Sequence, residues 1–148
     1  AVKLAKGCKI LGVPVIVTQQ YTKGLGPTIP GIHEAVGEYE PIEKTSFSAL
    51  GEPAFSEKLK SLGRKTVILA GVEAHVCVQQ TALDLLEKDY SVFLAADCVG
   101  SRANNDKKFA QRRMSESGAV VTTYEAILFE LCIGSKEPGF KEISALVK

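Results

Sequence analysis

Short apolar strands alternate with helices along this chain of 148 residues, and this alternation restricts the possible folds more than any other feature. Four segments rich in β-branched residues are predicted strands: 13–18, 66–70, 91–96 and 119–122. Helical patterns separate them and also occupy both ends of the chain. Because the strands are continuous apolar runs, both faces of the sheet should be covered. The sequence therefore predicts an α/β fold in which a mostly parallel central sheet lies between two helical layers.

The chain is predicted to be a single domain, residues 1–148, that is incomplete at its N-terminus. Residues 1–11 already have the pattern of a helix body, and no capping residue precedes them. An earlier element of the domain is therefore expected to lie before Ala1. Residues 19–38 are rich in glycine and proline, which predicts an irregular loop or lid.

Charge and cysteine usage argue against several classes of function. The chain has 18 Lys and Arg against 17 Asp and Glu, so no general field attracts nucleic acid or an anionic membrane. No apolar run reaches the ~20 residues that span a bilayer. The cysteines are scattered without the spacing of a zinc or redox motif, and Cys8, Cys98 and Cys132 lie in apolar contexts. This predicts a reducing compartment, the cytoplasm or the mitochondrial matrix.

Cys77 is the strongest candidate for a reactive residue because it follows the end of a predicted strand. Strand 66–70 ends at Gly71, and Cys77 falls in the first turn of a helix predicted from about His75. A helix N-terminus offers unpaired N–H groups and a partial positive charge, and both favour thiolate over thiol. The same N–H groups could stabilise an oxyanion formed by attack on a carbonyl. The alternative is that Cys77 is another small buried residue, since cysteine is commonly buried.

Lys44 and His75 are the possible partners of Cys77. Lys44 follows a possible short strand at 39–43, and a nearby ammonium lowers a thiol pKa and can carry a proton, although most lysines are solvated. His75 could form a Cys–His dyad, but two residues apart on a helix the side chains diverge by roughly 200°. His75 is therefore predicted to line a pocket or to be structural, and His33 to be exposed. Two histidines without a neighbouring Asp or Cys cluster predict neither a metal site nor a cofactor.

Several segments, in chain order, resemble the isochorismatase-like cysteine hydrolases, a family that includes isochorismatases, nicotinamidases and N-carbamoylsarcosine amidohydrolases. These segments are VPVIVTQQY, EKTSFSAL, GVEAHVCVQQTALDLL, DCVGSR and SGAVVTTYEAILFEL. Together they cover nearly the whole chain, and the nearest resemblance is to the small isochorismatase domain-containing proteins. The resemblance implies a three-layer α/β/α, Rossmann-like fold and a homo-oligomer, a dimer or larger.

The resemblance also implies an Asp–Lys–Cys triad in which Cys77 is the nucleophile and Lys44 the lysine. It implies a cis peptide bond between Val72 and Glu73, and an oxyanion hole made by the N–H groups of Glu73 and Cys77. The triad aspartate lies on the family's first strand, which is expected to precede Ala1. No aspartate of this chain is therefore assigned that role.

These expectations point to a metal-free hydrolase that acts on a C–N or ester bond of a small molecule. The segment after Thr18 lacks the acidic and histidine ligands of nicotinamidases, which favours the metal-free branch. The walls of the substrate pocket are expected from Tyr21, Phe47, His75 and Val76. The alternative is a catalytically silent interaction or scaffold domain of the same fold, which would need no triad aspartate.

The predicted partners are a small-molecule substrate and further copies of the chain, with neither nucleic acid nor a membrane. The candidate residues for self-association lie in the C-terminal helices and are Ile127, Leu128, Leu131 and Phe140.

Overall fold

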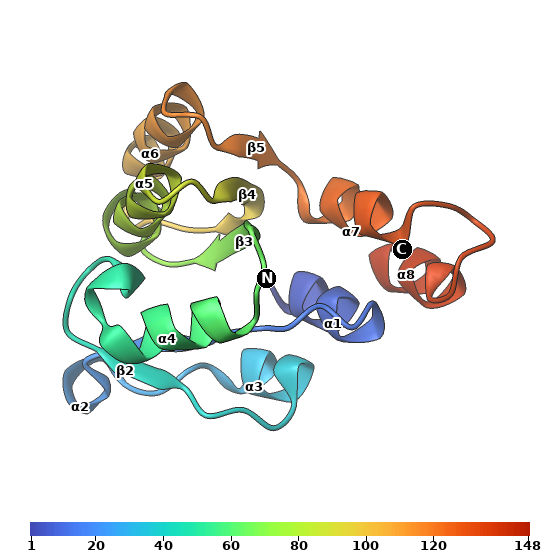
Figure 1. The fold of residues 1–148 in the computed structure, drawn as a ribbon, viewed down its shortest axis with the longest axis horizontal. Coiled ribbons are helices and arrows are strands. Elements are labelled where there is room, and N and C mark those ends of the chain that lie inside the picture. The colour runs from blue at the N-terminus through green and yellow to red at the C-terminus, as the bar shows by residue number, and fades with distance from the viewer.

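The computed structural model describes every residue from Ala1 to Lys148 and contains parallel strands surrounded by helices (Figure 1). The strands are β1 (Thr18–Gln20), β2 (Ile42–Lys44), β3 (Thr66–Gly71), β4 (Ser91–Val99) and β5 (Val120–Thr122). The α-helices are α1 (Val2–Ile10), α2 (Thr22–Leu25), α3 (Pro30–Val36), α4 (Pro53–Ser61), α5 (Gln79–Glu87), α6 (Asn104–Glu116), α7 (Tyr124–Cys132) and α8 (Phe140–Val147). Two further turns are the 3₁₀-helix η1 (Ala49–Gly51) and the π-helical η2 (Ala74–Val78).

The strands form two sheets, β1–β2 and β3–β4–β5, in which every pair is parallel. Thr66 of β3 lies opposite Ser91 of β4, and after an irregularity near the end of β3, Gly71 lies opposite Val99. The carboxyl ends of parallel strands meet at one edge of a sheet, where functional loops gather in such folds. This pairing therefore places the turn after β3 beside the loop after β4.

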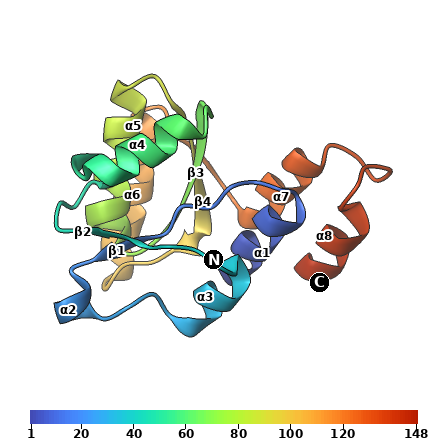
Figure 2. The ribbon, with the colours of Figure 1, turned by 60° about the horizontal axis from the view of Figure 1, so that its bottom comes forward.

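Two hydrophobic clusters cover the two faces of the β3–β4–β5 sheet. One cluster joins α4, η2, α5 and α6 to Val92 and Leu94, and the other joins α1, α7 and α8 to Ala95 and Cys98. Figure 2 shows the two groups of helices on opposite sides of β3 and β4. Side chains alternate between the faces of a strand, so one strand can supply both clusters. The predicted three-layer α/β/α arrangement is confirmed.

The predicted strand at 13–18 is largely wrong, because β1 begins only at Thr18. A strand needs a neighbour to complete its ladder, and residues 13–17 contribute little to one beyond the bond from the Ile42 N–H to the Val17 carbonyl (2.9 Å). Their apolar side chains are partly buried rather than paired in a ladder, since Ile16 packs against one cluster and Val13 against the other, while Val15 is exposed. No strand pairing joins β1 to β3, so the sheet predicted as one is divided into two.

Residues 19–38, predicted as an irregular loop, contain the short helices α2 and α3. The Gln19 side chain organises this segment, because its Oε1 accepts hydrogen bonds from the Thr28 N–H (2.9 Å) and hydroxyl (2.8 Å). Pro30 then starts α3 at a position where a helix N-terminus tolerates proline. Glycine and proline in this segment therefore do not exclude short helices, since Gly24 lies within α2 and Pro30 and Gly31 lie within α3.

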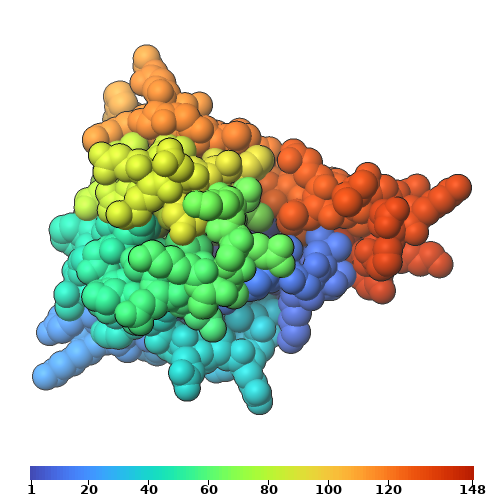
Figure 3. Space-filling model, viewed as in Figure 1, coloured from blue at the N-terminus to red at the C-terminus, as the bar shows by residue number.

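The predicted self-association surface on the C-terminal helices is partly wrong, because two of its four residues are buried. Ile127 is 2% exposed and Leu128 is fully buried, so both belong to the core beneath α7 rather than to an interface. Leu131 is exposed, while Phe140 is half-buried and packs beside Phe129. Figure 3 shows α7 and α8 extending to one side of the main body. No helix combines the length and apolar character that crossing a membrane requires.

Candidate active site

The side chains of Gln20, Lys44 and Cys77 meet beyond the carboxyl ends of the strands. The Cys77 Sγ lies 3.9 Å from the Gln20 Oε1, and the Lys44 Nζ lies 2.5 Å from the same oxygen. Gln20 and Lys44 are opposite each other in the β1–β2 register, which accounts for their proximity. The structure therefore brings together the predicted nucleophile and the predicted lysine through Gln20. Sequence reasoning missed Gln20, although its place at a strand end was a usable signal.

Lys44 is only 4% exposed, so it is not the solvated surface lysine of the alternative interpretation. Its Nζ donates to the Gln20 Oε1 and to the backbone carbonyls of Ser46 (3.0 Å) and Phe47 (2.9 Å). A buried ammonium is costly unless its donors are satisfied, and these three oxygens match its three N–H bonds. The contacts hold a positive charge in a fixed place near the Cys77 thiol.

Cys77 is half-buried in η2, the π-helical turn between β3 and α5. The sequence predicts an α-helix from about His75, and the structure replaces its first turn with this wider turn. Turns of this type occur frequently at functional sites. The peptide bond between Val72 and Glu73 is cis, at the position that the family resemblance implies. The Glu73 N–H has no hydrogen-bond acceptor within the chain, so it is free to donate to a bound oxyanion.

The predicted pocket residues lie in different surroundings. Tyr21 and Phe47 are more than half exposed, and Val76 is half-buried next to Cys77 in the chain. Surface cavities of about 290 Å³ and 370 Å³ lie beside α1, and neither is lined by any of these residues. The substrate pocket therefore stays a prediction.

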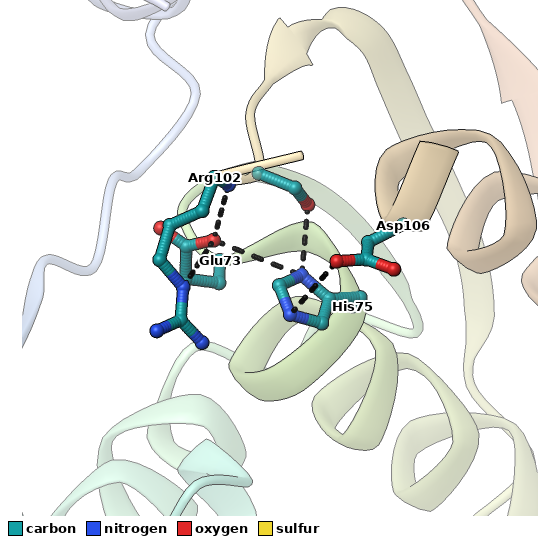
Figure 4. Close-up of polar contacts among 5 residues, drawn as sticks. Glu73, His75, Arg102 and Asp106 are labelled. Atoms are coloured by element: carbon teal, nitrogen blue, oxygen red, sulfur yellow. Dashed lines mark hydrogen bonds and ion pairs between the residues drawn. The ribbon is translucent and has the colours of Figure 1, made fainter. Parts of the chain in front are cut away.

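His75 belongs to a polar cluster on the side of η2 next to α6 (Figure 4). Its Nδ1 lies 3.0 Å from the Ser101 Oγ and 3.7 Å from the Glu73 Oε2, and its Nε2 lies 3.9 Å from the Asp106 Oδ2. The imidazole thus lies between two carboxylates and forms no hydrogen bond with Cys77. A Cys–His dyad is absent from the structure, as the predicted divergence of the two side chains requires.

Glu43, the neighbour of Lys44 in β2, anchors α2 to the site. The Thr22 N–H donates to the Glu43 Oε1 (2.6 Å), and the Thr22 hydroxyl donates to the other carboxylate oxygen. The hydrogen bond from the hydroxyl, followed by that from the backbone N–H, lowers the pKa of the Glu43 carboxyl. Sequence reasoning did not identify this contact, because it joins residues 21 positions apart.

The remaining cysteines and Asp97 have structural contacts rather than contacts with Cys77 or Lys44. Cys8, Cys98 and Cys132 are buried and unpaired, as the sequence predicts. Asp97 accepts a hydrogen bond from the Tyr124 N–H (2.9 Å) and so orders the start of α7. No group of three or more His, Cys, Asp or Glu side chains is arranged to hold a metal ion.

Comparison with known proteins places this geometry in a family. The family model described as the isochorismatase domain matches residues 1–126. Isochorismatase domain-containing protein 1 of Salmo salar is 45% identical over 147 residues, which are 99% of this chain and 51% of that protein. Isochorismatase domain-containing protein 2 of Danio rerio is 44% identical over 148 residues, 99% of this chain and 74% of that protein. The chain thus spans about half the length of the first relative and about three quarters of the second.

Two solved structures share the fold over nearly the whole chain. One is described as the MAR1 ribonuclease of Caenorhabditis elegans and is 44% identical, with a TM-score of 0.92 over 99% of this chain and 75% of its own. The other is the YcaC gene product of Escherichia coli, described as an octameric hydrolase of unknown specificity. It is 26% identical, with a TM-score of 0.91 over 98% of this chain and 73% of its own.

The contact between Glu43 and Thr22 predicts that acid weakens the fold in a specific way. The pKa of Glu43 is lower in the folded protein than in the unfolded chain. Its contribution to the free energy of unfolding is therefore fully present above the pKa in the unfolded chain, about 4.3, and is lost as the pH falls through the pKa in the folded protein. We expect urea unfolding at pH 7 to find Glu43→Gln less stable than the wild type. The difference should shrink below about pH 4, and a difference that stays constant between pH 7 and pH 3 would contradict this account.

The environments of the four cysteines predict selective alkylation. Burial raises the pKa of the Cys8 and Cys98 thiols, and Cys132 is buried as well, whereas Cys77 is partly accessible. With iodoacetamide at pH 7, peptide mass spectrometry should find Cys77 modified about tenfold or more faster than the others. The Cys77→Ser variant is the control and should lose the rapid phase. Equal rates at all four positions would show that Cys77 is not activated.

Proposed function

Because the chain belongs to the isochorismatase family, we propose that it is a hydrolase in which the Cys77 thiolate attacks the carbonyl carbon of a C–N or ester bond in a small molecule. The observation that carries the proposal is the convergence on the Gln20 Oε1, which lies within hydrogen-bond reach of both the Cys77 Sγ and the Lys44 Nζ. The proposed chemistry uses neither a metal ion nor a cofactor.

The buried ammonium of Lys44 supplies the electrostatic part of the proposal. Charges interact more strongly away from water, so a 4% exposed lysine has more influence on a nearby thiol than a surface lysine would. Its positive charge favours the Cys77 thiolate, and the thiolate is the nucleophilic form. Gln20 positions the Lys44 ammonium and, before it loses its proton, the Cys77 thiol, because its Nε2 donates to the Thr45 carbonyl (2.8 Å) and its Oε1 is left to accept from both.

The proposed reaction has two steps. The Cys77 sulfur bonds to the substrate carbonyl carbon, and the oxygen becomes an anion that receives the Glu73 and Cys77 N–H groups. The carbonyl re-forms, the C–N or C–O bond breaks, and the leaving amine or alcohol takes a proton through Lys44. Water then attacks the thioester, which releases a carboxylic acid and restores the thiol. In the family an aspartate on the first strand assists this proton transfer, and no aspartate of this chain bonds to Cys77 or Lys44.

Two alternatives use the same fold. A silent interaction or scaffold domain is the first, and it requires no working nucleophile. Cleavage of RNA is the second, and the description of the C. elegans neighbour as a ribonuclease supports it. The near balance of charge argues against strong RNA binding, which depends on neutralising phosphates. Binding of a labelled RNA oligonucleotide at low and high salt distinguishes this second alternative from the main proposal.

The proposal includes self-association in a reducing compartment, the cytoplasm or mitochondrial matrix. The octameric neighbour supports an oligomer, and the unpaired cysteines support the compartment. Ile133 is 86% exposed and lines the 290 Å³ cavity together with Ile10 and Leu131, and this exposed apolar surface is a suitable contact between copies. Sedimentation velocity should give a dimer or larger species, and Ile133→Asp should reduce its mass. A monomeric wild type at all concentrations would contradict self-association.

The main proposal predicts that Cys77 is required for turnover. With 4-nitrophenyl acetate as a probe ester, the Cys77→Ala variant should release nitrophenolate at least about 100-fold more slowly than the wild type, because no acyl-enzyme can form. Circular dichroism should show an unchanged fold, since Cys77 is only partly buried. EDTA treatment of the wild type is the second arm and should leave the rate unchanged. Equal release by the variant would favour the scaffold alternative.

A further inference from the structure

We propose that the loop from Gly100 to Ala103 is clamped onto the turn around Glu73, and that the side chains of Glu73, His75 and Ser101 act as positioning residues for the Glu73 N–H. This inference rests on the proposed function, which assigns that N–H to the oxyanion. It adds a role for polar contacts that the proposed reaction itself does not use.

Two backbone hydrogen bonds make the base of the clamp. The Gly100 N–H donates to the Gly71 carbonyl (3.1 Å), and the Ala74 N–H donates to the Gly100 carbonyl (2.7 Å). They enclose Glu73 in the sequence, because Gly71 precedes it and Ala74 follows it. The pairing of Gly71 with Val99 at the end of the sheet brings these segments together. The two ends of the turn are thus tied to one glycine of the neighbouring loop.

Two side-chain contacts extend the clamp beyond the backbone. The Arg102 N–H donates to the Glu73 Oε2 (2.8 Å; Figure 4). The Ser101 Oγ lies 3.0 Å from the His75 Nδ1. A hydrogen bond to an ionised carboxylate is stronger than one between neutral groups. The Arg102 guanidinium is 79% exposed with its Nε 3.9 Å from Glu73, so the backbone N–H of Arg102 is the important partner.

Asp106 connects the clamp to α6. Its Oδ2 lies 3.9 Å from the His75 Nε2, on the opposite side of the ring from Glu73 and Ser101. The His75 side chain is 22% exposed, so the ring is held among these groups rather than free in solvent. Three segments that are distant in the sequence are therefore fixed relative to one another: η2, the loop after β4 and the first turn of α6.

The position of the Glu73 N–H is what the clamp controls. That N–H has no partner within the chain, so no internal hydrogen bond fixes its direction. Its direction is set instead by the neighbouring Ala74 N–H and by the carboxylate of the same residue, both of which are bound to the loop. An oxyanion donor must be held within about 0.5 Å of its productive position to be effective. Loosening the clamp should therefore impair acylation without altering the thiolate.

Two probes separate these effects in the full chain. Acylation by 4-nitrophenyl acetate passes through an oxyanion, whereas alkylation by iodoacetamide displaces iodide and forms none. We expect Glu73→Ala and Ser101→Ala each to slow acylation about tenfold, less than the loss of a whole oxyanion donor. The rate of Cys77 alkylation should stay within about twofold of the wild type, because the thiolate is unaffected. Glu73→Gln keeps an oxygen acceptor for the Arg102 N–H and should restore most of the acylation rate.

A matched control and distinct outcomes make the test decisive. Glu116→Gln removes a carboxylate from the same helix as Asp106, where Glu116 pairs only with Arg112, and should change neither rate. The clamp is overturned if Glu73→Ala and Ser101→Ala acylate at the wild-type rate, or if both probes change equally. In either case a Cys77-dependent acylation of the wild type would leave the proposed function standing. Acylation that persists in Cys77→Ala would instead reject the proposed function itself.

Discussion

The parallel pairing of β3 with β4 determines where the candidate functional groups of this protein lie. Gly71 at the end of β3 lies opposite Val99, so the turn that carries Glu73 and Cys77 begins beside the loop that carries Ser101. Helices pack on both faces of this sheet, and their apolar side chains leave only its edges for polar groups. The η2 turn and the loop after β4 are therefore held together at one edge of this sheet.

The buried charge of Lys44 depends on the other sheet. An ammonium with 4% exposure needs oxygen partners, and β1 and β2 provide them by placing Gln20 opposite Lys44 and turning the chain so that two carbonyls face the Nζ. The same Gln20 oxygen reaches the Cys77 Sγ. No strand pairing joins the two sheets, so this contact through a side chain is one of the links between them at the site.

The predictions that depend on local pattern agree with the structure, and those that depend on distant partners agree less well. The strands predicted at 66–70 and 91–96 are present as β3 and β4, because the apolar, β-branched runs that favour them lie within each segment. The strand predicted at 13–18 fails because a strand exists only where a neighbour completes its hydrogen bonds. The prediction that Ile127 and Leu128 lie in an interface is wrong for a related reason. The apolar pattern of a helix does not indicate whether its apolar face is covered by other helices of the same chain, here α1 and α8, or by another copy.

The sequence by itself determined the α/β alternation, the layered architecture and the place of Cys77 just after a strand. Each of these follows from the period and composition of a short segment. The tertiary structure alone decided that Gln20 joins Cys77 and Lys44, that Glu43 anchors α2, and that His75 turns toward Ser101 and Asp106. These contacts join residues between 21 and 57 positions apart. Hydrogen bonds of this kind leave no periodic signal in a sequence, because they depend on how the strands pair and not on local propensity.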